Sequence, residues 1–133
     1  MFLLFLGGCD LLSSDASGEI VLTTVGDVYA PGEAVMLLIE NGTSRIIGFN
    51  LCAAAVEYQT EGRWHSATEN TIICPGILYT LKPGRTLTNA RQLCERLPAG
   101  TYRIRGTFGT VSDESENGEP FETATSNTFT VQG

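Results

Sequence analysis

Apolar and polar residues alternate along short runs in most of the chain, and Pro-Gly or Asn-Gly pairs separate these runs. Alternation with a period of two is typical of β-strands that bury one face. In the first run, residues 19–25, Ile20, Leu22 and Thr24 fall on one face. No stretch keeps a 3.6-residue period, although residues 87–97 could hold one helical turn. The pattern predicts an all-β domain.

The second run, residues 33–40, is apolar on both faces from Ala34 to Ile39, which is typical of a central, buried strand. Residues 46–58 include three consecutive alanines, but the alternation continues to Tyr58, so we expect one long strand there. The other predicted strands are residues 63–66, 77–81, 85–88, 102–108 and 127–131. About seven or eight short strands with regularly spaced turns favour a two-sheet antiparallel β-sandwich.

Composition limits the domain count and the class of partner. With 133 residues, 42% hydrophobic and 17% charged, the chain can form one globular domain. Its formal net charge is −7, whereas a general nucleic-acid binder carries a basic surface. We therefore expect no nucleic-acid partner.

The first residues are apolar but too few to span a bilayer, because a spanning helix needs about 20 apolar residues. They match the short core of a secretory signal. Leu6-Gly7-Gly8-Cys9 resembles the lipobox of bacterial lipoprotein precursors, in which the cysteine thiol receives a diacylglyceryl group and becomes the new N-terminus. No Lys or Arg precedes the apolar run, which an initiator further upstream would explain.

The lipobox interpretation divides the chain into three parts. Residues 1–8 are a lipoprotein signal segment, residues 9–18 are the lipidated Cys9 and a flexible tether rich in Ser and Asp, and residues 19–133 are the sandwich. It places the protein in the bacterial cell envelope, on the periplasmic face or the cell surface, with the membrane as a partner. The alternative is a buried N-terminal strand with a chance cysteine.

Four short segments resemble the bacterial immunoglobulin-like domain of secreted and lipid-anchored surface proteins. They are Tyr29-Ala-Pro-Gly-Glu33, Gly62-Arg-Trp64, Leu81-Lys-Pro-Gly84 and Leu97-Pro-Ala-Gly-Thr-Tyr-Arg-Ile104. The resemblance covers residues 19–131 and implies an immunoglobulin-like sandwich, but it indicates no single function because such folds host many roles.

Two aromatic residues of these segments have alternative interpretations. Tyr102, early in a late strand after a Pro/Gly turn, is either a tyrosine corner that bonds back to upstream backbone or a plain core aromatic. For Trp64 we expect packing under a sheet rather than stacking on a ligand.

Three cysteines remain after Cys9, and an oxidising compartment would allow one disulfide and one spare thiol. We favour a bond between Cys52, in the long predicted strand, and Cys74, just after the Trp64 hairpin. Such a bond would stabilise the fold by about 3 kcal/mol. Cys94 would then be spare. A Cys74–Cys94 bond is the main alternative.

Charge is segregated along the chain, with most basic residues between 82 and 105 and five acids without a base between 113 and 122. The basic span could meet an anionic partner such as lipid headgroups or a wall polymer. The alternative is that both are ordinary solvated surface. The candidate partner-binding residues are Lys82, Arg85, Arg103 and Arg105, and, in the acidic loop, Asp113, Glu114, Glu116 and Asn117.

The sequence offers no catalytic or metal-binding constellation, so we expect no cofactor and no metal. His65 is the only histidine, and an exposed structural position is expected for it. The acidic loop begins like an EF-hand loop, but Ala124 stands where a bidentate Glu is needed. We therefore predict a non-catalytic, membrane-anchored module that binds an unknown protein or envelope polymer or serves a structural role. The alternative is a protease inhibitor that uses the loop of residues 109–126, around Asn117 and Gly118.

Overall fold

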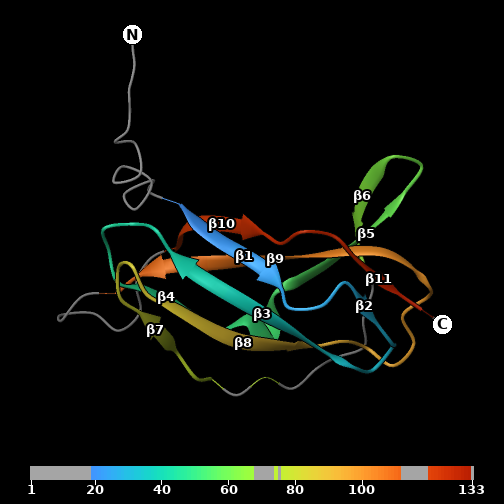
Figure 1. Cartoon of the computed structure of the whole chain (residues 1–133), viewed down its shortest axis with the longest axis horizontal. Helices are drawn as coiled ribbons and strands as arrows, with labels where there is room; N and C mark the ends of the chain where they lie inside the picture. The colour runs from blue at the N-terminus through green and yellow to red at the C-terminus, as the bar shows by residue number, and fades with distance from the viewer. Residues whose placement is uncertain (1–18, 68–73, 75, 112–119, 133) are drawn as a thin grey trace, which may run out of the picture.

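The structure is a computed structural model that describes residues 19–67, 74, 76–111 and 120–132. In this part of the chain, eleven strands form two sheets that pack face to face as a sandwich (Figure 1). The predicted all-β class and two-sheet architecture are confirmed. The strand number is higher than expected because one predicted strand is divided and two strands were not predicted.

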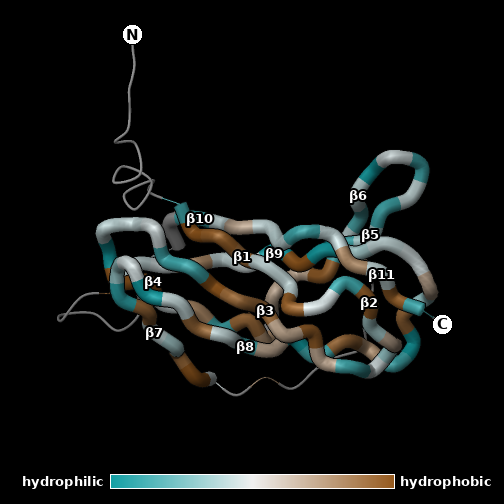
Figure 2. Tube along the Cα trace, viewed as in Figure 1, coloured by the Kyte–Doolittle hydropathy of each residue, from teal (hydrophilic) through white to brown (hydrophobic). Residues whose placement is uncertain are grey.

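The smaller sheet has the order β1-β3-β8, and all its pairs are antiparallel. Its strands are β1 (Ile20–Thr24), β3 (Ala34–Asn41) and β8 (Thr86–Gln92). Val35, Leu37 and Ile39 of β3 are fully buried against the larger sheet, and Figure 2 shows hydrophobic stretches along β1 and β3. Met36 on the opposite face is 39% exposed. The expectation that β3 is buried on both faces is therefore wrong.

The larger sheet is built around β9 (Gly100–Thr110), which pairs with four other strands. The strands along one edge of β9 are β10 (Pro120–Thr125) and β11 (Phe129–Val131), and those along the other edge are β4 (Ile47–Phe49) and β5 (Ala55–Thr60). The outer strands are β2 (Val28–Tyr29), β6 (Arg63–Ser66) and β7 (Tyr79–Leu81). Only β2 is parallel to its partner, β11.

The single strand predicted at residues 46–58 is wrong. Gly48 pairs with Gly109 and Ala55 pairs with Arg105, so the six residues between Gly48 and Ala55 lie opposite only three residues of β9. The excess leaves the sheet as a short 3-10 helix, Leu51–Ala53. Leu51 is buried there, and a side chain at Gly106 would lie 2.8 Å from its Cδ2 atom. The helical turn allowed at residues 87–97 is absent from 87–92, which belong to β8.

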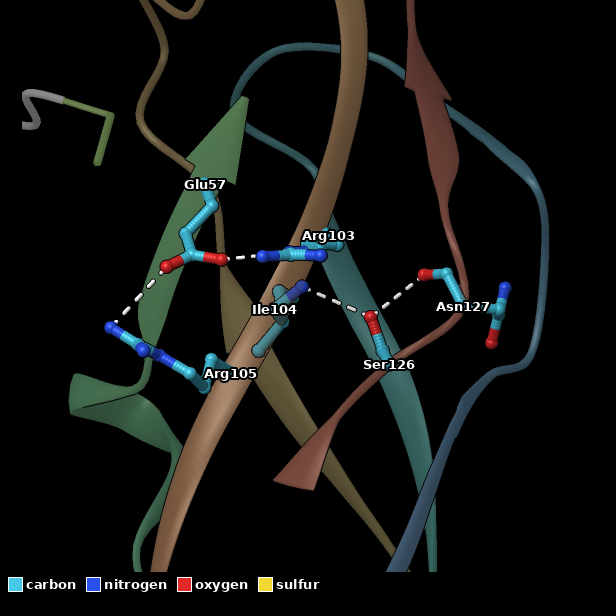
Figure 3. Close-up of polar contacts among 6 residues, drawn as sticks. All are labelled: Glu57, Arg103, Ile104, Arg105, Ser126 and Asn127. Atoms are coloured by element: carbon cyan, nitrogen blue, oxygen red, sulfur yellow. Dashed lines mark hydrogen bonds and ion pairs between the residues drawn. The ribbon is translucent and has the colours of Figure 1, made fainter. Parts of the chain in front are cut away.

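Strand β10 was not predicted, because its sequence was assigned to a loop of residues 109–126. It pairs with β9 from Arg105 to Gly109, with a bulge between Pro120 and Glu122. Ser126 fills the gap in pairing between β10 and β11: its Oγ atom accepts from the Ile104 N–H at 3.0 Å and donates to the Asn127 carbonyl at 2.8 Å (Figure 3). The backbone of β9 is therefore satisfied where its neighbour changes.

Tyr102 forms a tyrosine corner, which decides between the two interpretations of this residue. Its hydroxyl donates to the Pro98 carbonyl at 2.6 Å, four residues upstream, while its ring is 2% exposed. The ring stacks on Phe129 with centroids 6.2 Å apart, and Phe129 meets Tyr29 edge-on at 5.5 Å. This contact fixes the loop before β9 on the end of the core.

The predicted disulfide between Cys52 and Cys74 is present. It joins the 3-10 helix to the segment before β7, and its sequence separation is 22 residues. Cys94 lies outside this bond, half-buried, and its sulfur accepts from the Arg96 N–H at 3.4 Å.

Replacing Tyr102 by Phe should lower the free energy of unfolding by about 1 kcal/mol, because the buried corner loses one hydrogen bond and keeps its ring. Urea denaturation measures this loss. Tyr79→Phe is the matched control: the Tyr79 ring stacks on Phe49, but its hydroxyl has no hydrogen bond within the described part of the chain. Equal effects of the two variants would contradict the corner's role.

Candidate functional site

The hairpin of β5 and β6 projects from the sandwich and carries a candidate site on each face (Figure 1). Ala55 to Tyr58 pair with β9, whereas Glu57 to Thr60 pair with β6, so the hairpin continues the larger sheet beyond the smaller one. Glu61 and Gly62 form its turn with positive φ angles of 54° and 77°. The hairpin tip is hydrophilic in Figure 2.

On the outer face, Glu57 holds two arginines of β9. Its Oε1 atom accepts from Arg103 Nε at 2.7 Å, and its Oε2 atom lies 3.3 Å from Arg105 Nη2 (Figure 3). The Glu57 side chain is 9% exposed, that of Arg103 is 28% and that of Arg105 is 48%. Two cations share one carboxylate, so Glu57, Arg103 and Arg105 together carry a net positive charge. The most exposed of the three side chains is that of Arg105.

Trp64 completes this group, because the guanidinium carbon of Arg103 lies 4.1 Å from the centroid of its ring. Trp64 faces Gln59 across the hairpin, on the same side of the sheet as Glu57. The expectation that it packs under a sheet is wrong: the ring is half-buried on the outer face, and Arg103 covers it. We call Glu57, Trp64, Arg103 and Arg105 the outer-face cluster.

The inner face of the hairpin borders a cleft of about 430 Å³ at the end of the sandwich. Tyr58 and Tyr102 line it together with residues 97–101, which comprise the loop before β9 and the first two residues of that strand. Their rings lie 6.3 Å apart, and the Tyr58 ring is 5.4 Å from that of His65. His65 is exposed, as predicted.

The four predicted basic contact residues do not form one patch. Arg103 and Arg105 belong to the outer-face cluster, whereas Lys82 and Arg85 are exposed at the turn between β7 and β8. Leu81 lies beside that turn and pairs with Ile47 of β4, which in turn pairs with Thr110 of β9. Thr110 is five residues along β9 from Arg105. That spacing corresponds to about 17 Å of strand. Each group must be tested separately.

Arg91, in the middle of the basic span, is buried rather than exposed. Its Nε atom donates to the Ala54 carbonyl at 2.8 Å, which links β8 of the smaller sheet to the start of β5 in the larger one. Sequence reasoning assigned this arginine to solvated surface. Arg91 falls on the same face of the strand as Leu87 and Asn89, at every second position, and this pattern in the sequence indicates that it points inward.

Several predicted features lie outside the described residues. These include the lipobox with Cys9, the tether, and the acidic-loop residues Asp113, Glu114, Glu116 and Asn117. The lipid anchor and the protease-inhibitor alternative therefore stay predictions. Within the described ranges, no helix has the length and apolar character needed to cross a bilayer, and no group of three potential metal ligands occurs.

Comparisons with known proteins bear on the chain as a whole. The family of bacterial Ig-like domains matches residues 16–127. Comparison with curated proteins gives no match. Among solved structures, the ASH/PapD-like domain of human CEP192 (PapD-like domain 7) aligns with a TM-score of 0.39 and 17% identity, over 88% of this chain and 84% of that one.

Trp64 is the only tryptophan, so its fluorescence reports on the outer-face cluster alone. Arg103→Ala should shift its emission to longer wavelength, because the ring loses the side chain that covers it. Arg105→Ala is the control, since it removes the same charge and also a Glu57 contact while Arg103 still covers the ring. Equal shifts in both folded variants would contradict the stacked geometry.

Proposed function

Because the chain belongs to the bacterial Ig-like domain family, we propose that it is a non-catalytic binding module of the cell envelope. The module is held at the membrane through lipidated Cys9 and contacts an anionic wall polymer through the outer-face cluster. Family membership supports the domain type, but Ig-like sandwiches have many roles, so the argument for binding rests on the cluster itself.

The observation that carries this proposal is the combination of Trp64 with two arginines on one exposed face. Trp and Arg are enriched among the residues that dominate binding energy at interfaces. Glu57 and the Trp64 ring hold Arg103 in one geometry, so little side-chain freedom remains to be lost on binding. Arg105, with 48% of its side chain exposed, can donate to a carboxylate or phosphate of the partner.

The disulfide supports a location outside the cytosol. Disulfides persist in oxidising compartments, and Cys52–Cys74 joins the 3-10 helix to the segment before β7. The resemblance of residues 6–9 to a lipobox supports the anchor, and Cys9 would lie ten residues before Glu19, the first described residue. A tether of that length would let the domain turn its outer face to the wall.

Co-sedimentation with purified anionic wall polymer tests the binding surface. Arg105→Ala should weaken binding about fivefold or more, as expected for an interface residue worth above 1 kcal/mol. The matched control is Arg85→Ala, which removes the same charge at the β7–β8 turn and should change binding little. Equal losses would indicate general electrostatic attraction, and no loss with Arg105→Ala would contradict this surface as the contact.

Mass spectrometry of the native protein tests the anchor independently. The proposal predicts a mature chain that starts at Cys9 and carries acyl chains, together with release into the soluble fraction on Cys9→Ser. A chain that retains Met1, carries no acyl mass and partitions into the aqueous phase of a detergent separation would contradict the anchor. It would leave the binding surface unaffected.

A further inference from the structure

The two outer edges of the smaller sheet differ in how their backbone amides are satisfied. At the β1 edge, the Ile20 N–H donates to Glu122 Oε2 at 3.1 Å and the Thr24 N–H donates to Asn127 Oδ1 at 2.8 Å. Both acceptors come from the larger sheet or the segment just after β10. Side chains therefore occupy these two amides, so the β1 edge cannot pair freely with another strand.

Among the described residues, no side chain covers the β8 edge in this way. The bonds from Asn41 N–H to the Arg85 carbonyl and from Leu93 N–H to the Glu33 carbonyl fix which β8 residues bond to β3. Because bonding alternates in an antiparallel pair, the residues between them at even positions direct their amides and carbonyls away from β3. These residues are Thr86, Thr88, Ala90 and Gln92. The first three are exposed and have no hydrogen-bond partner within the described part of the chain, whereas the Gln92 carbonyl accepts from Arg91 Nη1.

The β8 edge also lacks the usual protection against pairing. Natural sheets protect long exposed edges with lysines, prolines or bulges, or keep the edge strand very short. Strand β8 is seven residues long, pairs with β3 without a register shift, and has neither charge nor proline from Thr86 to Ala90. Its edge is a regular row of open donors and acceptors.

We propose that this edge pairs with the same edge of a second copy of the chain, antiparallel about a two-fold axis at Thr88. In that register Thr88 faces its own copy and Thr86 faces Ala90 of the second chain, so each outward amide from Thr86 to Ala90 meets a carbonyl. The pairing is isologous, as closed dimers require. It joins two three-stranded sheets into one of six strands.

The composition of the strand favours a second copy as the occupant. Residues 86–90 carry no charge, so in a chain of net charge −7 like charges of the two copies meet only at the ends of the contact, where Arg85 stands opposite an Arg91 that is buried and bonded to the Ala54 carbonyl. Threonines facing each other across strands are favourable pairs. The contact is small, so the dimer should be weak and depend on concentration. The inference does not depend on the anchor or on the outer-face cluster.

Cysteine crosslinking tests the register in a background that carries both Cys9→Ser and Cys94→Ser, which leaves only the Cys52–Cys74 pair. Thr88→Cys should form a disulfide-linked dimer on mild oxidation, since facing Cα atoms in a bonded pair lie about 5.5 Å apart. Thr86→Cys alone should not, because its copies would stand about 13 Å apart. A mixture of Thr86→Cys and Ala90→Cys chains should crosslink. Crosslinking of Thr86→Cys alone, or of no variant, would overturn the proposal.

Sedimentation of the unmodified domain tests the association itself, at concentrations up to about 1 mM. Thr88→Pro should abolish dimers without unfolding the domain, because the amide that it removes makes no bond within the sheet. Thr23→Lys places a charge on the outer face of β1, away from this edge, and should leave dimers intact. A domain that stays monomeric throughout, or dimers lost with Thr23→Lys and kept with Thr88→Pro, would overturn the edge contact.

Discussion

Backbone pairing along both edges of β9 is the constraint on which the rest of the structure depends. Four strands take their register from this one strand, two on each side. Each side has a break: at one, Ser126 replaces a strand partner at Ile104, and at the other, the 3-10 helix packs Leu51 against Gly106. The Ser126 break therefore costs little backbone hydrogen bonding, and the two breaks allow β9 to pair with two different strands along each edge.

The same strand couples the core to the candidate site. Its inward side chains, Tyr102, Ile104 and Phe108, are buried, while Arg103 and Arg105 alternate with them on the outer face. Any slip of β9 by one residue would exchange these two sets. The core thus fixes where the arginines meet Glu57, and the tyrosine corner fixes the loop that borders the cleft on the other face of the hairpin. Packing in the core is what orients the surface.

Much of this arrangement follows from local sequence, and the rest depends on long-range pairing. Alternation identified the inward residues of the main strands, and Cys52 was correctly paired with Cys74 because both border neighbouring segments. The break after β4 could not be predicted, because it reflects a mismatch of length against β9. Strand β10 was read as loop because of its acidic neighbours. The prediction was wrong for Arg91, because its burial depends on the distant Ala54 carbonyl. It was wrong for Trp64, because the position of this ring on the outer face depends on Arg103 of the distant strand β9.

Native-state hydrogen exchange tests the central role of β9 most directly. If this strand anchors the larger sheet, the amides from Tyr102 to Phe108 should exchange only through global unfolding, with the highest protection in the domain. Amides that face solvent on the β8 edge in the monomer, such as that of Thr88, should exchange far faster. Exchange of the β9 amides through an opening several kcal/mol below global unfolding, while other strands stay protected, would contradict the account.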